Sequence, residues 1–298
     1  MKYTNLGKSD LRISRIGFGC MSLKGGIAKV RSVIDRAIEL GINYYDTADL
    51  YDDGANEALL GEVFAGRRDK VVIATKVGNQ MRKDGSGWDW NPNKEYILEA
   101  VEKSLRRLKI DYIDLYQLHG GTIDDPIDDT IEAFETLKSQ GKIRNYGISS
   151  IRPDVIRRYA ESSDIVSVMM QYSLLDRRAE ESCFELLEKH RIGLLARGSV
   201  AQGLLVNKPA KPYLGKDEKE VKHIAEVLKS VSGKERSNTQ TAIQFVLHSP
   251  VVTSAVVGMH TIEQLEDAVN ALTVPAPGIE EINILNKEAR PGYYTDHR

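Results

Sequence analysis

Short apolar runs alternate with longer amphipathic segments along almost the whole chain. The short runs have the length of strands, whereas the longer segments space their apolar residues three or four positions apart, which is typical of helices with one buried face. In the segment Lys94–Leu108, one such stripe holds Ile97, Val101, Leu105 and Leu108. The pattern therefore predicts strands and helices in regular alternation.

A β-hairpin is predicted over residues 3–13, around the turn Gly-Lys-Ser-Asp. The strands predicted after it are Ile16–Cys20, Tyr44–Asp46, Val71–Thr75, Ile113–Gln117, Asn145–Ser149, Val166–Gln171, Gly193–Ala196 and Ser254–Val257. The predicted helices are Lys29–Leu40, Ala55–Phe64, Lys94–Leu108, Thr130–Gln140, Pro153–Ala160, Glu181–His190, a helical region Asp217–His248, Ile262–Leu272 and Ile279–Glu288. The first helix is expected to end at Gly41, because a left-handed glycine can close the last helical turn.

This alternation, without any break in composition, predicts a single (β/α)8 TIM barrel domain over residues 1–298. The hairpin would precede the barrel, and extra helices would follow it at the C-terminus. The alternative is a doubly wound open sheet, which is expected to carry Gly-x-Gly-x-x-Gly between its first strand and first helix. The segment Gly17-Phe18-Gly19-Cys20-Met21-Ser22 has no third glycine, and no helix starts directly after it. The barrel is the better prediction.

Composition is that of an ordinary globular protein, with 41% hydrophobic and 28% charged residues and a net charge of −2. Such balanced charge predicts neither a nucleic-acid-binding nor a membrane-binding surface. Cys20 and Cys183 are too few and too far apart for a disulfide framework or a metal cluster. No apolar signal core or membrane-spanning run is found, so a cytoplasmic protein is expected. The predicted helices show no apolar excess on their outer faces, which makes a monomer the simplest expectation.

Ionisable residues gather where the predicted strands end, and in a (β/α)8 barrel these ends form the active-site face. Asp46 ends the second strand, Lys76 directly follows the third, and His119 comes two residues after the fourth. Tyr51 follows Asp46 by five residues, just before the next predicted helix. A lysine beside Asp46 would form a partly buried ion pair, and its charge would favour the ionised form of a nearby phenol.

Each of these residues alone has an ordinary explanation, since loop lysines are commonly solvated and lone histidines are commonly structural. Together they suit proton transfer to an oxygen that becomes an alkoxide, with Tyr51 as the general acid. His119 would hold the substrate oxygen or relay the proton. No cysteine or histidine spacing matches a metal site, so hydrogen bonds alone would polarise the electrophile.

Three motifs at these strand ends resemble the aldo-keto reductases: Asp46-Thr-Ala-Asp-Leu-Tyr51, Ala74-Thr75-Lys76 and Leu115-Tyr-Gln-Leu-His119. The resemblance extends from the hairpin to about Leu272. It implies a (β/α)8 barrel that reduces aldehydes or ketones by direct hydride transfer from NADPH. It also implies that Tyr51 donates the proton, that Lys76 and Asp46 assist it, and that His119 orients the carbonyl. The chain looks most similar to the bacterial stress-type and hydroxynonenal-reducing members, which suggests detoxification of reactive aldehydes.

The resemblance also implies a set of nicotinamide-binding residues. Ser149 in Gly147-Ile148-Ser149-Ser150 matches the family's Gly-Val-Ser-Asn, although Ser150 replaces the Asn, and Gln171 matches the glutamine that binds the carboxamide. Arg197 stands where the family usually places a tyrosine that stacks on the nicotinamide. A planar guanidinium can also stack, but its charge would disfavour the oxidised, cationic ring. The other residues expected to border this part of the cofactor are Gly19, Cys20, Met21 and Asp46.

Two further segments resemble the phosphate-binding parts of the family. The loop after the seventh strand resembles the strap over the pyrophosphate, with contacts expected from Gly198, Ser199, Val200, Gln202 and Gly203. After the eighth strand, backbone amides at the start of a helix could meet the adenosine 2′-phosphate, with contacts expected from Gly258, His260, Thr261 and Gln264. These positions include no lysine or arginine, so the expected preference for NADP rests only on the resemblance of this segment to the family.

The substrate pocket is expected to include Met21, Trp88 and Trp90. The loop 78–92 follows Lys76 and carries both tryptophans, so it either walls the pocket or forms a surface lid. Tyr293 and Tyr294 could reach the pocket, although tail aromatics more often pack on outer helices.

Two other functions compete with the reductase. A cofactor-sensing subunit, like the channel β-subunits of the same fold, is disfavoured because all four catalytic residues are kept and a long N-terminal extension is missing. A Schiff-base aldolase that uses Lys76 is disfavoured by the Tyr51–Asp46 pair beside it.

Overall fold

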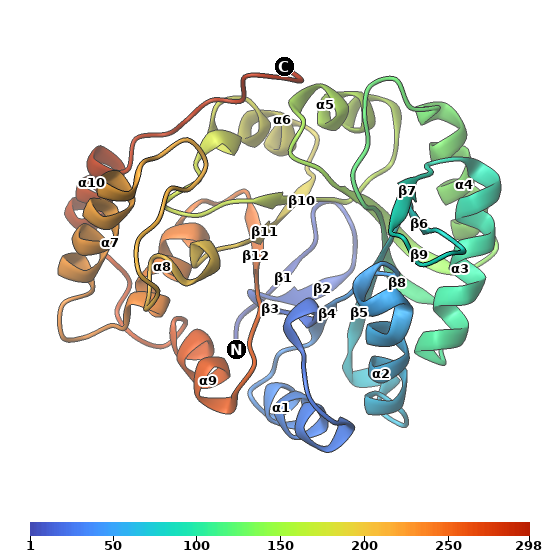
Figure 1. The fold of residues 1–298 in the computed structure, drawn as a ribbon, viewed down its shortest axis with the longest axis horizontal. Coiled ribbons are helices and arrows are strands. Elements are labelled where there is room, and N and C mark those ends of the chain that lie inside the picture. Colours follow the sequence, from blue (N-terminus) through green and yellow to red (C-terminus); the bar gives the residue numbers. More distant parts are fainter.

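Eight parallel strands close into a barrel in the structure, a computed structural model that covers residues 1–298. The order of the strands around the barrel is β10-β11-β12-β3-β4-β5-β8-β9. The helices lie outside the strands and surround them (Figure 1). The predicted (β/α)8 barrel is therefore confirmed. None of its helices combines the length and the apolar character needed to cross a membrane.

The barrel strands are β3 (Ile16–Gly19), β4 (Tyr44–Asp46), β5 (Val72–Val77), β8 (Ile113–Leu118), β9 (Ile143–Ser149), β10 (Ser167–Gln171), β11 (Gly193–Arg197) and β12 (Val252–Val257). The α-helices are α1 (Ile27–Glu39), α2 (Ala55–Val63), α3 (Lys94–Leu108), α4 (Ile127–Ser139), α5 (Pro153–Ser162), α6 (Cys183–Lys189), α7 (Glu218–Ser232), α8 (Asn238–His248), α9 (Ile262–Asn270) and α10 (Ile279–Glu288). Two antiparallel hairpins pair β1 (Tyr3–Asn5) with β2 (Arg12–Ser14) and β6 (Asn79–Met81) with β7 (Trp88–Trp90). Short 3-10 turns are η1 (Cys20–Ser22), η2 (Tyr51–Gly54), η3 (Arg68–Lys70), η4 (Arg178–Glu180) and η5 (Ala201–Gly203).

Two features differ from the sequence-based prediction. The helical region 217–248 is two helices, because the chain turns at Gly233 and Ser237 then starts α8 with a capping box to Gln240. The loop 78–92 contains the hairpin β6–β7. The other predicted strands and helices are present, and Gly41 has the expected left-handed conformation, with φ of 87°.

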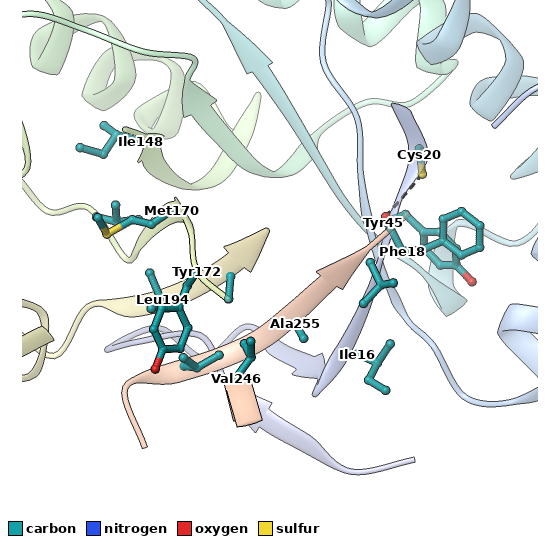
Figure 2. Packing of buried hydrophobic residues seen from close by; sticks show 14 of the residues in the cluster. Ile16, Phe18, Cys20, Tyr45, Ile148, Met170, Tyr172, Leu194, Val246 and Ala255 are labelled. Atoms are coloured by element: carbon teal, nitrogen blue, oxygen red, sulfur yellow. Dashed lines mark hydrogen bonds between the residues drawn. The ribbon is translucent and has the colours of Figure 1, made fainter. Parts of the chain in front are cut away.

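The barrel interior and the layer between strands and helices form separate cores. The interior core consists of Leu6, Ile13, Tyr44, Ala74, Leu115, Val166, Met169, Leu195 and Val256. Leu6 and Ile13 belong to the N-terminal hairpin region, so this region closes the amino-terminal end of the barrel. The outer core holds 71 buried residues. Figure 2 shows part of it, including Phe18 and Tyr45, whose stacked rings lie 5.9 Å apart.

The alternation of side chains along three neighbouring strands sets up the functional face. The apolar interior positions of β4, β5 and β8 are Tyr44, Ala74 and Leu115. Two residues later, and therefore pointing the same way, come Asp46, Lys76 and Gln117. Because Lys76 pairs with Gln117 in the strand register, these polar side chains lie next to one another at the carboxyl ends of their strands.

Helix α2 lies so close to the end of α3 that only glycine fits at position 61. A Cβ atom on Gly61 would lie 2.4 Å from the carbonyl oxygen of Arg107 and 2.8 Å from the carbonyl carbon of Leu108. Since both are backbone atoms, α2 would have to move, and Gly61→Ala should lower the free energy of unfolding by about 1–3 kcal/mol. Chemical denaturation measures this loss. Gly26→Ala is the control, since no atom lies within 4 Å of its added Cβ. Equal losses in both variants would contradict the explanation.

Candidate active site

The ammonium group of Lys76 is buried at the end of β5, where it makes three hydrogen bonds. It donates to Asp46 Oδ1 over 2.5 Å, to the Thr47 carbonyl oxygen over 2.7 Å and to Tyr51 Oη over 3.3 Å. The side chains of Lys76 and Asp46 are only 1% and 5% exposed. An ammonium group has three N–H bonds, so all of them are used. The structure thus brings Asp46, Lys76 and Tyr51 into direct contact.

The hydroxyl hydrogen of Tyr51 is left free by this arrangement. Its oxygen accepts a hydrogen bond from Lys76, and its hydrogen has no acceptor within the protein. Lys76 Nζ also lies 4.9 Å from the centre of the Tyr51 ring. A positive charge at this distance stabilises the phenolate that remains once the proton has left. The group can therefore donate a proton to a molecule in front of Tyr51.

Lys76 remains charged despite its burial. Burial, the largest single effect, would lower the pKa of Lys76, but the negative charge of Asp46 and the interactions with Tyr51 together outweigh burial and raise that pKa above its ordinary value. Asp46 is held in turn by two donors on its other oxygen, with Gln117 Nε2 at 3.2 Å and the Tyr44 hydroxyl at 3.4 Å. Gln117 and Tyr44 were not among the predicted site residues, although the period-two pattern of the strands points both of them inward.

His119 faces Tyr51 edge to face, with ring centres 5.9 Å apart and ring planes at 82°. The His119 amide donates to the Val77 carbonyl oxygen over 2.7 Å, and the His119 carbonyl oxygen accepts from Asn79 Nδ2 over 3.3 Å. These two hydrogen bonds fix the backbone of His119. Burial, together with the charges of Lys76 and Arg197, lowers the pKa of His119 to about 3. The imidazole is therefore neutral near pH 7, and its buried Nδ1 has no partner. Such a ring can bond to a substrate oxygen without adding charge.

A cavity of about 640 Å³ opens in front of these groups. It is lined by Met21, Leu50, Tyr51, Lys76, His119, Gly120, Ser149, Ser150, Ile151, Arg152, Met169, Arg178, Arg197 and residues 293–297. The C-terminal segment leaves α10 and runs across to α5 and α6 (Figure 1). Its residues 293–297 form one side of the cavity. The Asp154 amide holds this segment by donating to the His297 carbonyl oxygen over 3.0 Å.

Neither tryptophan predicted for the substrate pocket lines this cavity. Trp88 lies on β7 and is 48% exposed. Trp90 donates a hydrogen bond from Nε1 to Asp125 over 3.0 Å, which anchors the β6–β7 hairpin beside the barrel mouth. Tyr293 and Tyr294 line the cavity instead, and Tyr294 is held by the Arg178 guanidinium, 4.7 Å above its ring.

The residues predicted after β3 separate in the structure. Met21 lines the cavity and is 62% exposed, whereas Cys20 is fully buried behind it. The Cys20 thiol points to the Phe18 carbonyl oxygen, 3.6 Å away, as Figure 2 shows. Gly19 lies against β12, where an added Cβ would be 3.4 Å from the Val257 carbonyl group.

Three residues predicted for the nicotinamide, Ser149, Gln171 and Arg197, lie at one wall of the cavity. Ser149 and Arg197 line it, and Arg197 Nη1 donates to Gln171 Oε1 over 3.1 Å. Gln171 Nε2 donates in turn to the Tyr213 hydroxyl over 2.8 Å. Tyr213 was not predicted, since it lies in an irregular segment that no motif marks.

The segments predicted for the cofactor phosphates offer polar atoms that lack partners. The turn after β11 contains Gly198, Ser199, Val200, Gln202 and Gly203. Ser199 Oγ in this turn is buried without a hydrogen-bond partner. This hydroxyl group can donate a hydrogen bond to an oxygen of a pyrophosphate.

The start of α9 is organised by its own side chains. Thr261 Oγ1 accepts from the Gln264 amide over 3.3 Å, and Gln264 Oε1 accepts from the His260 amide over 2.8 Å. The amide of Ile262 stays unbonded at the positive end of the helix, where an anion is favoured, whereas the Glu263 amide bonds to the carboxylate of its own side chain. Gly258 lies just before them, where an added Cβ would be 3.1 Å from Ser22 Oγ. The residues present thus fit a dinucleotide cofactor.

A second polar network supports the loop after β4 from outside the barrel. Glu57 on α2 is fully buried and accepts from Thr75 Oγ1 over 2.5 Å and from Arg107 Nε over 2.7 Å. The Asp49 amide donates to the Lys76 carbonyl oxygen over 3.3 Å, while Asp49 Oδ1 is buried without a partner. Burial, with the charge of Glu57, raises the pKa of Asp49 to about 7. The loop that carries Tyr51 therefore rests on a carboxyl group that titrates near neutral pH.

A closed parallel barrel with a buried lysine–carboxylate pair and a tyrosine at its carboxyl end defines a class of nicotinamide-dependent oxidoreductases. The chain belongs to the aldo-keto reductases, because the profile of the Aldo/keto reductase family matches residues 15–287. Members of this family use nicotinamide cofactors and act on small carbonyl compounds.

Two similar proteins, one known by its sequence and one by its structure, match this chain over its whole length. The uncharacterized oxidoreductase YqkF of Bacillus subtilis (strain 168) is 49% identical over 307 residues, which cover 100% of both chains. The holo form of the aldo-keto reductase AKR11C1 from Bacillus halodurans is 49% identical, with a TM-score of 0.94 over 100% of this chain and 99% of that one. The NADH-specific methylglyoxal reductase of Escherichia coli (strain K12) is 33% identical over 234 residues, which are 72% of each chain.

Asp49→Asn should change how stability depends on pH. The unfolded chain loses the Asp49 proton near pH 3.9, its ordinary pKa, to within about one unit, whereas the folded protein keeps it up to a pKa of about 7. The unfolded state therefore binds fewer protons over this window, and the free energy of unfolding falls as pH rises, by about 2 kcal/mol between roughly pH 5 and pH 7. An amide cannot ionise, so the variant should lack this fall.

Urea denaturation of both proteins at the two pH values measures the difference, in which pH-independent effects of the substitution cancel. Asp53→Asn, which changes an exposed carboxylate in the same loop, is the control and should keep the wild-type slope. An unchanged slope in Asp49→Asn would show that this carboxyl group ionises normally.

Proposed function

We propose that the chain reduces small aldehydes and ketones to alcohols with NADPH, and that Tyr51 is the proton donor. The observation that carries this proposal is the bonding of Lys76. Because its three N–H bonds go to Asp46, Thr47 and Tyr51, the phenol oxygen is an acceptor toward Lys76 and its hydrogen is available to a substrate.

The reaction needs one hydride and one proton. When bound, the reduced nicotinamide supplies the hydride to the carbonyl carbon. Tyr51 gives its hydroxyl proton to the carbonyl oxygen, so that C=O becomes CH–OH and a phenolate remains. Lys76 stabilises this phenolate across 3.3 Å, and Asp46 keeps Lys76 in place and charged. Tyr51 then recovers a proton from solvent before the next turnover.

His119 is the other acid that could serve, and its pKa argues against that role. With a pKa of about 3, the ring carries no extra proton near pH 7. It can still donate a hydrogen bond to the carbonyl oxygen, which polarises the carbonyl group and holds it beside Tyr51. We therefore assign His119 to orienting the substrate.

The same bonding argues against an aldolase. A Schiff base forms only from an uncharged amine, and the raised pKa of Lys76 keeps it protonated. All of its N–H bonds are also engaged within the protein. Borohydride with a keto substrate should therefore trap no adduct on Lys76.

NADPH is the cofactor that we assign. The free amide of Ile262 at the start of α9 favours an additional phosphate, and Ser149, Gln171 and Arg197 offer a nicotinamide wall. The relative from Escherichia coli is by its name specific for NADH, so the choice of cofactor needs a direct measurement. We further propose that the substrates include reactive aldehydes, as in the hydroxynonenal-reducing branch, and these compounds should be tested first.

Tyr51→Phe should lower the rate of NADPH oxidation with aromatic and unsaturated aldehydes by about 100- to 10,000-fold, the range of a lost general acid. NADPH binding, followed by fluorescence, should be unchanged. Tyr3→Phe at the opposite end of the barrel is the control and should keep full activity.

Full activity of Tyr51→Phe would contradict the assignment of Tyr51 as the proton donor. A wild-type protein that binds NADPH but reduces none of the aldehydes would instead favour a cofactor-sensing subunit.

Arg197→Tyr should change the preference between oxidised and reduced cofactor. The Arg197 charge already contributes to the low pKa of His119, so it acts within this wall of the site. It should repel the cationic oxidised ring by about 1 kcal/mol. Removing it should lower the ratio of the NADP+ to the NADPH dissociation constant by about fivefold. Arg197→Lys keeps the charge and should keep the ratio. If the ratio stays constant in Arg197→Tyr, the guanidinium does not face the nicotinamide.

A further inference from the structure

The cavity has an excess of positive charge. Of its cationic residues, Arg178 is paired with the buried Asp176 through two bonds of 2.8 and 2.9 Å, and Lys76 is paired with Asp46. The remaining two, Arg152 and Arg197, form no ion pair within 4.0 Å.

Asp296 is the only carboxylate among the residues that line the cavity. It accepts a hydrogen bond from the neighbouring Thr295 hydroxyl over 3.3 Å and pairs with no cation. One carboxylate thus faces two guanidinium groups that have no partner. A partly enclosed cavity with such an excess attracts anions.

Arg197 lies on the wall where the cofactor is proposed to bind, whereas Arg152 lies between this wall and the loop that carries His119. Arg197 is bonded to Gln171, and the two predicted phosphate-binding segments follow β11 and β12. Arg152 follows β9, which pairs with β8, the strand that leads to His119. Ser149 of the nicotinamide wall also ends β9, but the Arg152 guanidinium is bonded to Gly121 in the loop after His119, so its charge lies toward the place proposed for the substrate carbonyl group.

One edge of the Arg152 guanidinium is available to a ligand. Nη1 donates to the carbonyl oxygen of Gly121, two residues after His119, and this bond orients the group. It is the only hydrogen bond that the guanidinium makes within the protein. The remaining edge, formed by Nε and Nη2, is the edge that binds a carboxylate through two parallel hydrogen bonds.

We propose that Arg152 binds a carboxylate of the substrate, so that the preferred substrates are aldehydes or ketones that also carry a carboxylate group. The inference rests on the proposed carbonyl reduction and narrows its substrate class. His119 and Tyr51 hold the carbonyl oxygen, Arg152 holds the carboxylate, and the tail residues 293–297 reduce the access of water to the ion pair.

A matched pair of substrates tests this proposal. The para and meta isomers of carboxybenzaldehyde carry the anion, and their methyl esters have the same ring and aldehyde without the charge. Wild-type enzyme should have a kcat/KM at least about tenfold higher for the acid than for the ester, and added salt should reduce this advantage.

Arg152→Met should lower kcat/KM for the acid by about 10- to 100-fold, mainly through KM, which is the range of a lost charge-assisted hydrogen bond. Its kcat/KM for the ester and its dissociation constant for NADPH should stay within about twofold. Arg152→Lys should recover part of the acid activity, because it keeps the charge but not the planar edge.

Equal losses for acid and ester, a loss of NADPH affinity, or a wild-type enzyme without preference for the acid would each overturn the proposal. If the wild type reduces neither compound, the proposed function has failed. The anion site at Arg152 is then tested separately, by ligand binding. In calorimetric titrations of the NADP+-loaded wild type, benzoate should then bind and benzamide should not. Equal binding of the two would overturn the assignment of Arg152 by itself.

Discussion

The site depends on one ammonium group that stays charged inside a barrel. A buried lysine without partners gives up its proton, because desolvation of the charged form is costly. Here Asp46, the Thr47 carbonyl group and Tyr51 supply a partner for every N–H bond of Lys76. Removing any of them would leave a buried polar group unsatisfied. The contacts that make burial of Lys76 tolerable are therefore the same contacts that hold Tyr51 in the position proposed for the proton donor.

The need to surround the buried Lys76 with partners explains why the strand residues of the site are rigid, whereas the loop that carries Tyr51 is strained. Asp46 and Lys76 lie on strands, where the register fixes their positions. Tyr51 lies on a loop, and the three residues after it have left-handed conformations, with φ of 50° at Asp52, 52° at Asp53 and 80° at Gly54. Non-glycine residues adopt this conformation at a cost of about 1–2 kcal/mol each. The buried Glu57–Arg107 pair at the start of α2 and the bond to Lys76 hold the loop in this shape.

How much could be predicted from the sequence depended on where each residue lies. The barrel and the contact among Asp46, Lys76 and Tyr51 followed from apolar periodicity and from the rule that strand ends meet at one face. The break between α7 and α8 was missed, although Ser237 and Gln240 have the spacing of a capping box. Arg152, Tyr213 and the C-terminal tail could not be placed, since contacts between loops distant in sequence put them at the cavity. Trp88 and Trp90 show the converse, because hydrophobic residues in a loop do not reveal which side they face.

Strand residues of the site could be predicted and loop residues could not, and this difference has a physical origin that bears on function. The groups proposed to move the proton are carried by strands or tied to them, and their directions follow from a period of two along a closed sheet. Groups that surround the substrate are carried by loops, which can change without disturbing the barrel core. Arg152 belongs to the second kind, since it is fixed by a single bond to the loop after His119. Similar chains can therefore keep the reaction while cofactor and substrate differ, and the substrate of this one has to be sought from the charges of its loops rather than from its motifs.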